Sequence, residues 1–133
     1  MLKIPIFFLL APLSALILYA ALRAPAWSEH YMLAAGAAAY CMFATLDVRS
    51  TVRFGRRTVC SMESSPVFSW AARHGLRGAI AVQCILELFL AVLAVPYFAV
   101  YSMSAAVTGA ALLIMGAIHC TGYSMNRRLL RRT

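Results

Sequence analysis

Acidic residues are scarce in this 133-residue chain, which has four of them against twelve lysines and arginines. Charged residues of both signs make up only 12% of the sequence, about half the share that is usual for a soluble domain. A soluble fold of this length needs polar residues to cover its surface, and the chain lacks them. The composition therefore excludes an ordinary soluble domain and predicts a single-domain integral membrane protein.

Motifs of several large enzyme classes are also missing. The sequence contains no nucleophile elbow, P-loop, H-E-x-x-H motif or dinucleotide-binding fingerprint. Its four cysteines form no C-x-x-C pair, which argues against a disulfide framework. These absences weaken an enzymatic interpretation without excluding one.

Four apolar segments follow one another along the chain, each close to the length that crosses a bilayer. We predict an all-α integral membrane bundle whose four transmembrane helices cover residues 4–22, 31–47, 78–95 and 105–123. The first segment is longer than the apolar part of a usual signal peptide, so we interpret it as a membrane helix. Asp47 is expected to close the second helix, and Pro96 is expected to end the third. Ser65-Pro66 favours a short interfacial helix before the third span.

Basic residues gather in a loop at residues 48–77 and in a tail at residues 124–133. With four spans, eleven of the twelve basic residues share one side with both termini, and Arg23 alone falls on the other. The positive-inside rule then predicts a multi-pass protein with both termini in the cytoplasm, or on the equivalent side of an organelle. Basic groups beside a membrane attract anionic headgroups, so we expect lipid or an acidic partner surface there, and no nucleic acid. The residues expected to make these contacts are Arg53, Arg56, Arg57, Arg127 and Arg128.

Glu87 is the most informative residue, because it lies near the middle of the third predicted span. A carboxyl group at that depth is costly unless it is protonated, paired or beside water. His119 is expected at a similar depth, since the third and fourth spans are joined by a short turn and should pack antiparallel. We therefore predict an intramembrane polar site of Glu87, His119 and Gln83. It either handles protons, ions or small solutes, or is a neutral hydrogen-bonded contact for packing.

A second polar cluster is expected where the bundle opens to the cytoplasm. Its predicted members are Asp47, Glu63, His74 and Asn126. For Asp47, a structural ion pair with Arg49 or Arg53 is the simpler interpretation.

A metal or haem is not expected. Sulfur, imidazole and carboxylate groups fall in one layer of the predicted bundle, and transition metals use such ligands, but spacing along separate helices constrains a site little. A haem held by two histidines would need His74 opposite His119, and His74 lies too near the interface. We therefore predict no cofactor, apart from bound lipid, and leave a metal undetermined.

The pattern Asp47-x-x-x-Thr51-x-x-x-Gly55 followed by Glu63-x-Ser65-Pro66 resembles an uncharacterised family of small multi-helix prokaryotic membrane proteins. In that family an Asp near the end of a helix precedes a Gly and an E-x-N-P loop, and a later helix carries a His. This chain has Ser65 in place of the Asn. The resemblance implies a polar site built from Asp47, Glu63 and His119, and it implies no particular activity.

Two function classes stay open. Short loops and a run of small residues at Ala34–Ala39 favour an accessory or assembly subunit of a larger membrane complex, with other membrane subunits as partners. Glu87 favours the alternative, a membrane protein with its own intramembrane polar site. On the sequence alone we prefer the accessory subunit by a narrow margin.

Overall fold

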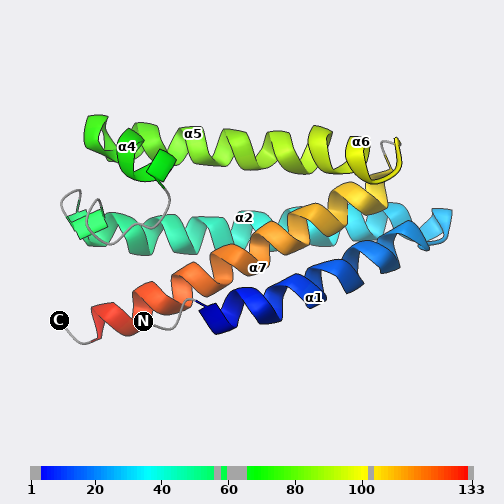
Figure 1. Cartoon of the computed structure of the whole chain (residues 1–133), viewed down its shortest axis with the longest axis horizontal. Helices are drawn as coiled ribbons and strands as arrows, with labels where there is room; N and C mark the ends of the chain where they lie inside the picture. Colours follow the sequence, from blue (N-terminus) through cyan, green and yellow to red (C-terminus); the bar gives the residue numbers. More distant parts are fainter. Residues whose placement is uncertain (1–3, 56–57, 60–65, 102–103, 132–133) are drawn as a thin grey trace.

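The computed structural model describes residues 4–55, 58–59, 66–101 and 104–131, and these form helices joined by turns, with no strand among them. The predicted all-α class is therefore confirmed, and four long helical segments make up most of the molecule (Figure 1). These are α1 (Ile4–Leu22), α2 (Glu29–Arg53), α5 (Leu76–Phe89) with its continuations η2 (Leu90–Ala94) and α6 (Val95–Val100), and α7 (Ala105–Leu130). Two shorter elements are η1 (Ala26–Ser28) and α4 (Pro66–His74).

Helix α2 does not end at Asp47, so that prediction is wrong. The helix continues to Arg53, because the residues after Asp47 include no proline or glycine before Gly55. Gly55 adopts a φ of 73°, a left-handed conformation that glycine enters without the steric penalty of a side chain. Asp47 therefore lies about 9 Å inside the helix end, at a rise of 1.5 Å per residue.

Pro96 does not end the third span either. Helix α5 passes through one π turn, η2, and continues as α6 to Val100. A proline inside a helix lacks the N–H for the usual bond, and its ring collides with the carbonyl four residues earlier. A π turn just before Pro96 accommodates the proline by changing the hydrogen-bond register, so the helix goes on.

The predicted basic loop and tail are also more helical than expected. Residues 48–53 belong to α2, residues 66–74 form α4, and α7 extends beyond residue 123 to Leu130. A short helix does precede the third span, as the Ser65-Pro66 pair predicted. Gly75 follows it, and its N–H donates to the carbonyl of Ala71 at 3.2 Å before α5 begins.

The tightest packing joins α2 to α7. Gly36 meets the backbone of Gly109 so closely that a Cβ on either glycine would overlap the backbone of the opposite helix. Further along, a Cβ on Gly116 would lie 3.1 Å from backbone atoms of Ala39 and Tyr40. Small residues at such crossings let two helices approach closely inside a bilayer. The remaining helices pack around this pair, with α1 against α7 through Ala21 and its apolar neighbours.

Three helices are long and apolar enough to cross a membrane: Ala26–Arg53, Leu76–Ala99 and Ala105–Leu130. The outward faces carry large apolar side chains such as Ile85, which is 66% exposed, and Phe98, which is 80% exposed. Apolar surface of this extent is what lipid-facing helices present. The chain is therefore a helical protein with three candidate membrane spans.

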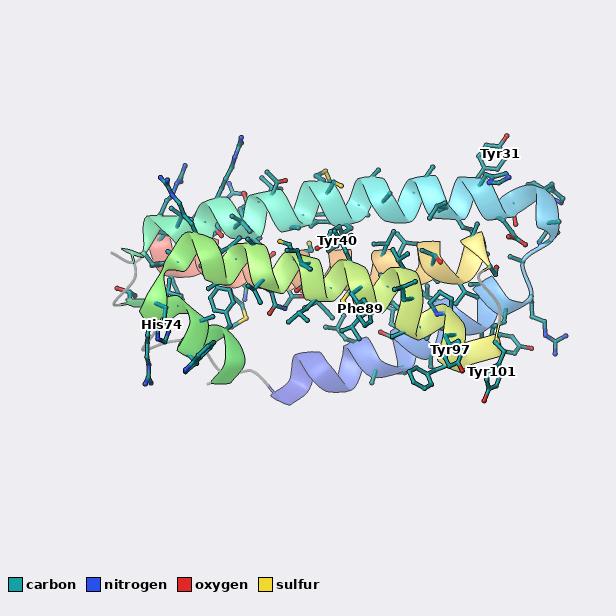
Figure 2. The ribbon with its side chains drawn as sticks, turned by 90° about the horizontal axis from the view of Figure 1, so that it is seen from above. Tyr31, Tyr40, His74, Phe89, Tyr97 and Tyr101 are labelled. Carbon is teal, nitrogen blue, oxygen red and sulfur yellow. The ribbon has the colours of Figure 1, made fainter. Side chains whose placement is uncertain are left out.

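The two ends of the helical bundle differ in amino-acid composition. The start of α1, the end of α2, helix α4, the start of α5 and the end of α7 lie toward one end. The end of α1, the start of α2, helix α6 and the start of α7 lie at the other (Figure 1). We call the first the basic end, and it is defined by Arg49, Arg53, Arg73, Arg77, Arg127, Arg128 and Arg131. Tyr31, Tyr97 and Tyr101 lie at the opposite end, away from His74 (Figure 2). Such aromatic residues are enriched at membrane–water interfaces.

Candidate functional site

The imidazole of His119 is the centre of a polar network inside the bundle. Its Nδ1 lies 2.8 Å from Oδ2 of Asp47, and its Nε2 lies 2.8 Å from Oε2 of Glu87. The three residues come from three different helices, α7, α2 and α5. His119 and Glu87 are buried, and Asp47 is half-buried. One imidazole therefore bridges two carboxyl groups within the packed helices.

Glu87 is held by two further hydrogen bonds. The hydroxyl of Tyr40 donates to Oε2 at 3.0 Å, and the amide of Gln83 donates to Oε1 at 2.6 Å. Gln83 is one helical turn before Glu87, so both side chains project from the same face of α5. The rings of Tyr40 and His119 meet edge-on, with their centroids 5.8 Å apart. Figure 2 shows Tyr40 near the middle of the molecule's length. The Glu87 carboxyl is thus held by side chains from three helices: His119 of α7, Tyr40 of α2 and Gln83 of α5.

Asp47 continues the network toward the basic end. Its Oδ1 accepts a hydrogen bond from Nδ2 of Asn126 at 3.0 Å. The same nitrogen lies 3.0 Å from Oγ of Ser50 and 3.0 Å from Oγ1 of Thr51. Because the amide has two hydrogens, it shares them among three acceptors. The network therefore runs without interruption from Gln83 to the last turns of α2 and α7.

The sequence of α7 explains how this face is built. His119, Gly122 and Asn126 follow at spacings of three and four, which brings them to one side of a helix. A Cβ on Gly122 would lie 2.8 Å from Oδ2 of Asp47, so the absence of a side chain leaves room for that carboxyl group. On α2, Tyr40 and Asp47 are seven residues apart and share a face in the same way. The two faces meet because α2 and α7 approach closely at their glycines.

Beyond Glu87, toward the end opposite the basic end, the core is apolar. Ala91, Ala110, Ala111 and Leu112 pack there with exposures of 0 to 5%. Among the described residues, no buried side-chain nitrogen or oxygen lacks a hydrogen-bond partner. The polar network is therefore continuous toward the basic end and meets close-packed small side chains on its other side.

The structure joins residues that the sequence assigned to two clusters. Glu87, His119 and Gln83 meet as expected, and Asp47 and Asn126 belong to the same network rather than to a separate mouth cluster. The expected ion pair of Asp47 with Arg49 or Arg53 is wrong, since within the described part of the chain Asp47 pairs with His119.

The other predicted site residues lie elsewhere. His74 is exposed, its Nδ1 lies 3.1 Å from the carbonyl of Trp70, and its ring packs on the indole with centroids 4.9 Å apart. Arg53, Arg127 and Arg128 are exposed at the basic end. Glu63, Arg56 and Arg57 lie outside the described residues.

Four residues of the network were not predicted as site residues: Tyr40, Ser50, Thr51 and Gly122. The seven-residue spacing of Tyr40 and Asp47 was a usable signal, because two helical turns return a residue to nearly the same face. Gly122 carried no such signal, since its role depends on the carboxyl group of another helix.

For metals and haem, the geometry gives no ligand set among the described residues. No group of three or more His, Cys, Asp or Glu side chains in the described ranges converges as a metal-binding set. His119 already has a carboxyl oxygen 2.8 Å from each ring nitrogen, so a metal or haem iron would have to displace one of them. A metal thus stays undetermined.

Comparisons with known proteins add no further constraint. The resemblance built on Asp47 and Glu63 stays a prediction, and the function has to be inferred from the geometry of the network itself. No protein-family model, curated protein or solved structure matches the chain.

Proposed function

We propose that this chain is a membrane protein that binds and releases protons at an intramembrane site formed by Asp47, His119 and Glu87, and that it uses this site to handle protons, ions or small solutes. The observation that carries the proposal is the single imidazole with a carboxyl oxygen 2.8 Å from each of its nitrogens. A contact made only for packing needs one donor and one acceptor. Three titratable groups in series, each from a separate helix, are the composition of a proton relay.

Counting protons shows what the site can do. Each of the two short contacts of His119 needs one proton between nitrogen and oxygen, so two protons shared by the three groups satisfy both. The net charge is then −1, either as an imidazolium between two carboxylates or as a neutral imidazole with one carboxyl protonated. These two arrangements differ only by the movement of a proton along an existing hydrogen bond. The site is therefore able to shift a proton between Asp47 and Glu87 without rearranging the helices.

The outer oxygens of both carboxyl groups support a change in proton number. Oε1 of Glu87 accepts from the amide of Gln83, and Oδ1 of Asp47 accepts from the amide of Asn126. An amide carries a donor and an acceptor on one rotatable group, so a flip lets it accept from a newly protonated carboxyl. A third proton is thus accommodated on either acid, with a net charge of zero. An arginine or lysine in place of Gln83 or Asn126 could only donate hydrogen bonds, so it would favour the ionised carboxylate over the protonated acid.

Protons reach the site from the basic end in this proposal. Asn126, Ser50 and Thr51 continue the hydrogen-bonded network toward that end, whereas Ala91 and Leu112 close the opposite side with apolar packing. Helix α1 has 19 residues, or about 28 Å, enough for a fourth crossing of the hydrocarbon core. Four spans with the basic end in the cytoplasm follow the positive-inside rule, and proton exchange then occurs with the cytoplasm.

The proposal is tested by infrared difference spectroscopy of the full-length protein in lipid, with pH jumps between two buffered states. Wild type should show a carboxylic-acid carbonyl band that changes with pH, and Glu87→Gln should remove or displace it. The matched control is Glu29→Gln, which removes an acid outside the network and should leave the band in place. Circular dichroism of each variant checks folding. An identical band in wild type and Glu87→Gln, with both proteins folded, would contradict proton binding at this site.

An accessory subunit is the second candidate, and the apolar outer face of α5 and α6 is the observation in its favour. Ile85, Phe89 and Phe98 are more than half exposed along that face. Lipid covers such a face as well as a partner subunit does, so we rank this function second. Purification in mild detergent decides: a stable complex with other membrane proteins supports the accessory role, and a chain that purifies alone and retains its pH-dependent band supports the proton site.

A further inference from the structure

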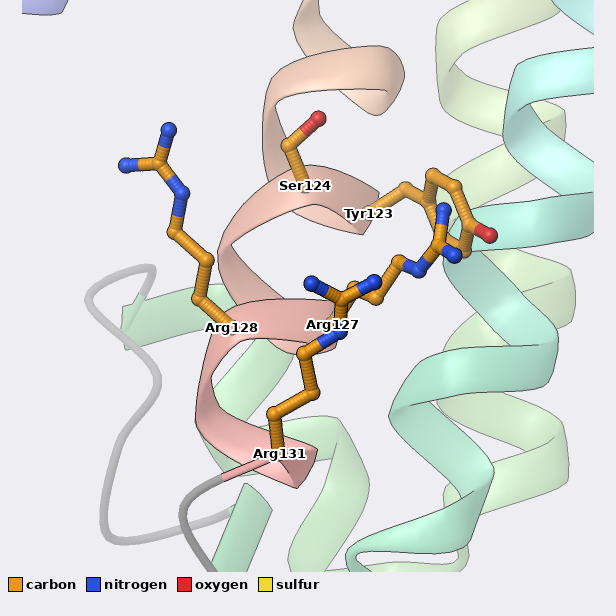
Figure 3. Close-up of a pocket in the computed structure, with 5 residues that line it drawn as sticks. All are labelled: Tyr123, Ser124, Arg127, Arg128 and Arg131. Atoms are coloured by element: carbon orange, nitrogen blue, oxygen red, sulfur yellow. The ribbon is translucent and has the colours of Figure 1, made fainter.

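A hollow of about 230 Å³ lies on the last turns of α7, apart from the polar network. Figure 3 shows Arg127 extending toward Tyr123 on one side of the helix and Arg128 extending to the other side, while the Arg131 side chain rises from the turn below toward Arg127. The lining residues are Tyr123, Ser124, Arg127, Arg128 and Arg131. The hollow is therefore lined by side chains that carry three guanidinium groups and two hydroxyls, and each of these groups can donate hydrogen bonds.

The positive charge of this hollow has no counter-charge from the described part of the protein. Helix α7 contains no aspartate or glutamate, and within the described residues no arginine lies at ion-pair distance from a carboxylate. Asp47, the acid closest in sequence to the basic end of α2, is engaged by His119 and Asn126. Arg127 and Arg131 are four residues apart, a spacing at which like charges on a helix repel. An anion between them would remove that repulsion.

The helix dipole repels an anion at this end of α7, but this repulsion is weaker than the attraction of the three arginines. The C-terminal end of a helix carries about half a negative elementary charge. Three arginines carry a formal charge of three, so the local field stays strongly positive. Guanidinium groups also present paired N–H donors that match two oxygens of a phosphate.

The length of α7 brings the hollow to the phosphate layer of a bilayer. At 1.5 Å per residue, Tyr123 lies about 27 Å and Arg131 about 39 Å from Ala105 along the helix. The hydrocarbon core is about 30 Å thick, so a helix that enters it at Ala105 leaves it just beyond Tyr123. The tyrosine then marks the boundary of the core, and the arginines lie among the headgroups.

We propose that this hollow is a binding site for a phosphate monoester. A monoester offers three terminal oxygens and a charge of about −1.5 to −2, whereas a phosphodiester offers two terminal oxygens and one negative charge. Three guanidinium groups together with the hydroxyls of Tyr123 and Ser124 match the monoester better in charge and in number of donors. The phosphate comes either from a lipid headgroup, as in phosphatidic acid, or from a soluble phosphorylated molecule. This site is independent of the proton site, so failure of one leaves the other standing.

The test measures binding to full-length protein in nanodiscs by native mass spectrometry and fluorescence titration. Discs of phosphatidylcholine contain either phosphatidic acid or, at equal total charge, phosphatidylserine. Wild type should bind phosphatidic acid at least tenfold more tightly than phosphatidylserine. The combined variant Arg127→Gln, Arg128→Gln and Arg131→Gln should lose this preference.

A matched control has the same change of charge at the same end of the bundle. It combines Arg49→Gln, Arg73→Gln and Arg77→Gln, three exposed arginines outside the hollow, and it should keep the preference. The pair Tyr123→Phe and Ser124→Ala keeps every charge and should weaken binding several-fold, which serves if the arginine variant fails to fold. Equal binding of the two lipids, or equal losses in both triple variants, would overturn the proposal in favour of general attraction to anionic membranes.

A second arm identifies the source of the phosphate. Glycerol 3-phosphate is titrated into discs of phosphatidylcholine alone, and then into discs that already hold phosphatidic acid. Binding in the first case and displacement in the second indicate a soluble ligand. Neither effect, together with selective binding of phosphatidic acid, indicates a lipid headgroup. Absence of binding in both arms contradicts the site.

Discussion

Replacing Gly122 with alanine tests how tightly the polar network is held. The Cβ of an alanine there would lie 2.8 Å from Oδ2 of Asp47, and ordinary contact begins at 3.4 Å. The carboxyl group must therefore retreat from α7 by about 0.6 Å. Because His119 is on α7 too, its 2.8 Å contact with Asp47 should lengthen to about 3.4 Å. That distance exceeds the usual range of about 2.7–3.2 Å for such a hydrogen bond.

The expected loss can be set against the gain in helix propensity. A hydrogen bond to a charged group contributes about 1.5–3 kcal/mol, while interhelical bonds measured in membranes average about 0.6 kcal/mol with a maximum near 1.7. Alanine in place of glycine stabilises a helix by up to about 1 kcal/mol. The control is Gly78→Ala in α5. A Cβ there meets nothing within 4 Å, so only the gain in helix propensity is expected. We expect Gly122→Ala to be less stable than Gly78→Ala by about 1–2 kcal/mol.

The assay is unfolding in mixed micelles of mild detergent and dodecyl sulfate, followed by circular dichroism. Both variants are measured beside wild type at one pH, since the network is titratable. Equal free energies of unfolding for the two alanine variants would refute the argument. Such a result would mean that the Asp47 carboxyl has room to move and that its contact with His119 adds nothing measurable.

Three further predictions address other parts of the molecule. Tyr40→Phe removes the 3.0 Å hydrogen bond to Glu87 and should lower the free energy of unfolding by about 0.5–1.5 kcal/mol, whereas Tyr31→Phe, at a 72% exposed position, should change it little. Gly109→Leu should separate α2 from α7, because any side chain there overlaps the backbone at Met32, and loss of the folded helical signal in detergent is the measurement; retention of wild-type stability would show that this crossing does not hold the pair. In a background without native cysteines, Ser124→Cys should react with an impermeant maleimide only after intact cells are opened and Ser28→Cys should react before, and the reverse pattern would invert the proposed topology.

The position of a residue along its helix was predictable from the sequence. Which neighbouring helix its side chain faces was not. A rise of 1.5 Å per residue brought Glu87 and His119 to similar levels, and they are in contact. Asp47 was assigned to surface arginines because the helix was expected to stop there. Since α2 continues to Arg53, Asp47 is inside the bundle, where His119 reaches it.

Which faces of α2 and α7 meet depends on information spread over two distant segments. The contact is set by the backbone approach at Gly36 and Gly109, which are 73 residues apart in the sequence. Neither glycine identifies its partner, since small residues are frequent throughout both helices. The proximity of Asn126 to Asp47 was predicted from their shared depth, but the position of Gly122 against the Asp47 carboxyl follows from that approach and could be described only once the two helices were placed together.

The π turn in the third long helix has a consequence for how its two ends are related. Side chains buried along this helix are Ala79, Glu87, Ala91 and Pro96, and the last three follow at spacings of four and then five. A regular helix would require four again, and the one additional residue in the η2 turn keeps the following segment facing inward. Deleting a single residue from Leu90–Ala94 should therefore rotate Tyr97 and Tyr101 relative to α7 while Glu87 keeps its partners. An insertion or deletion at this turn would therefore change which way the segment after the turn faces, while the contacts of Glu87 before the turn stay as they are.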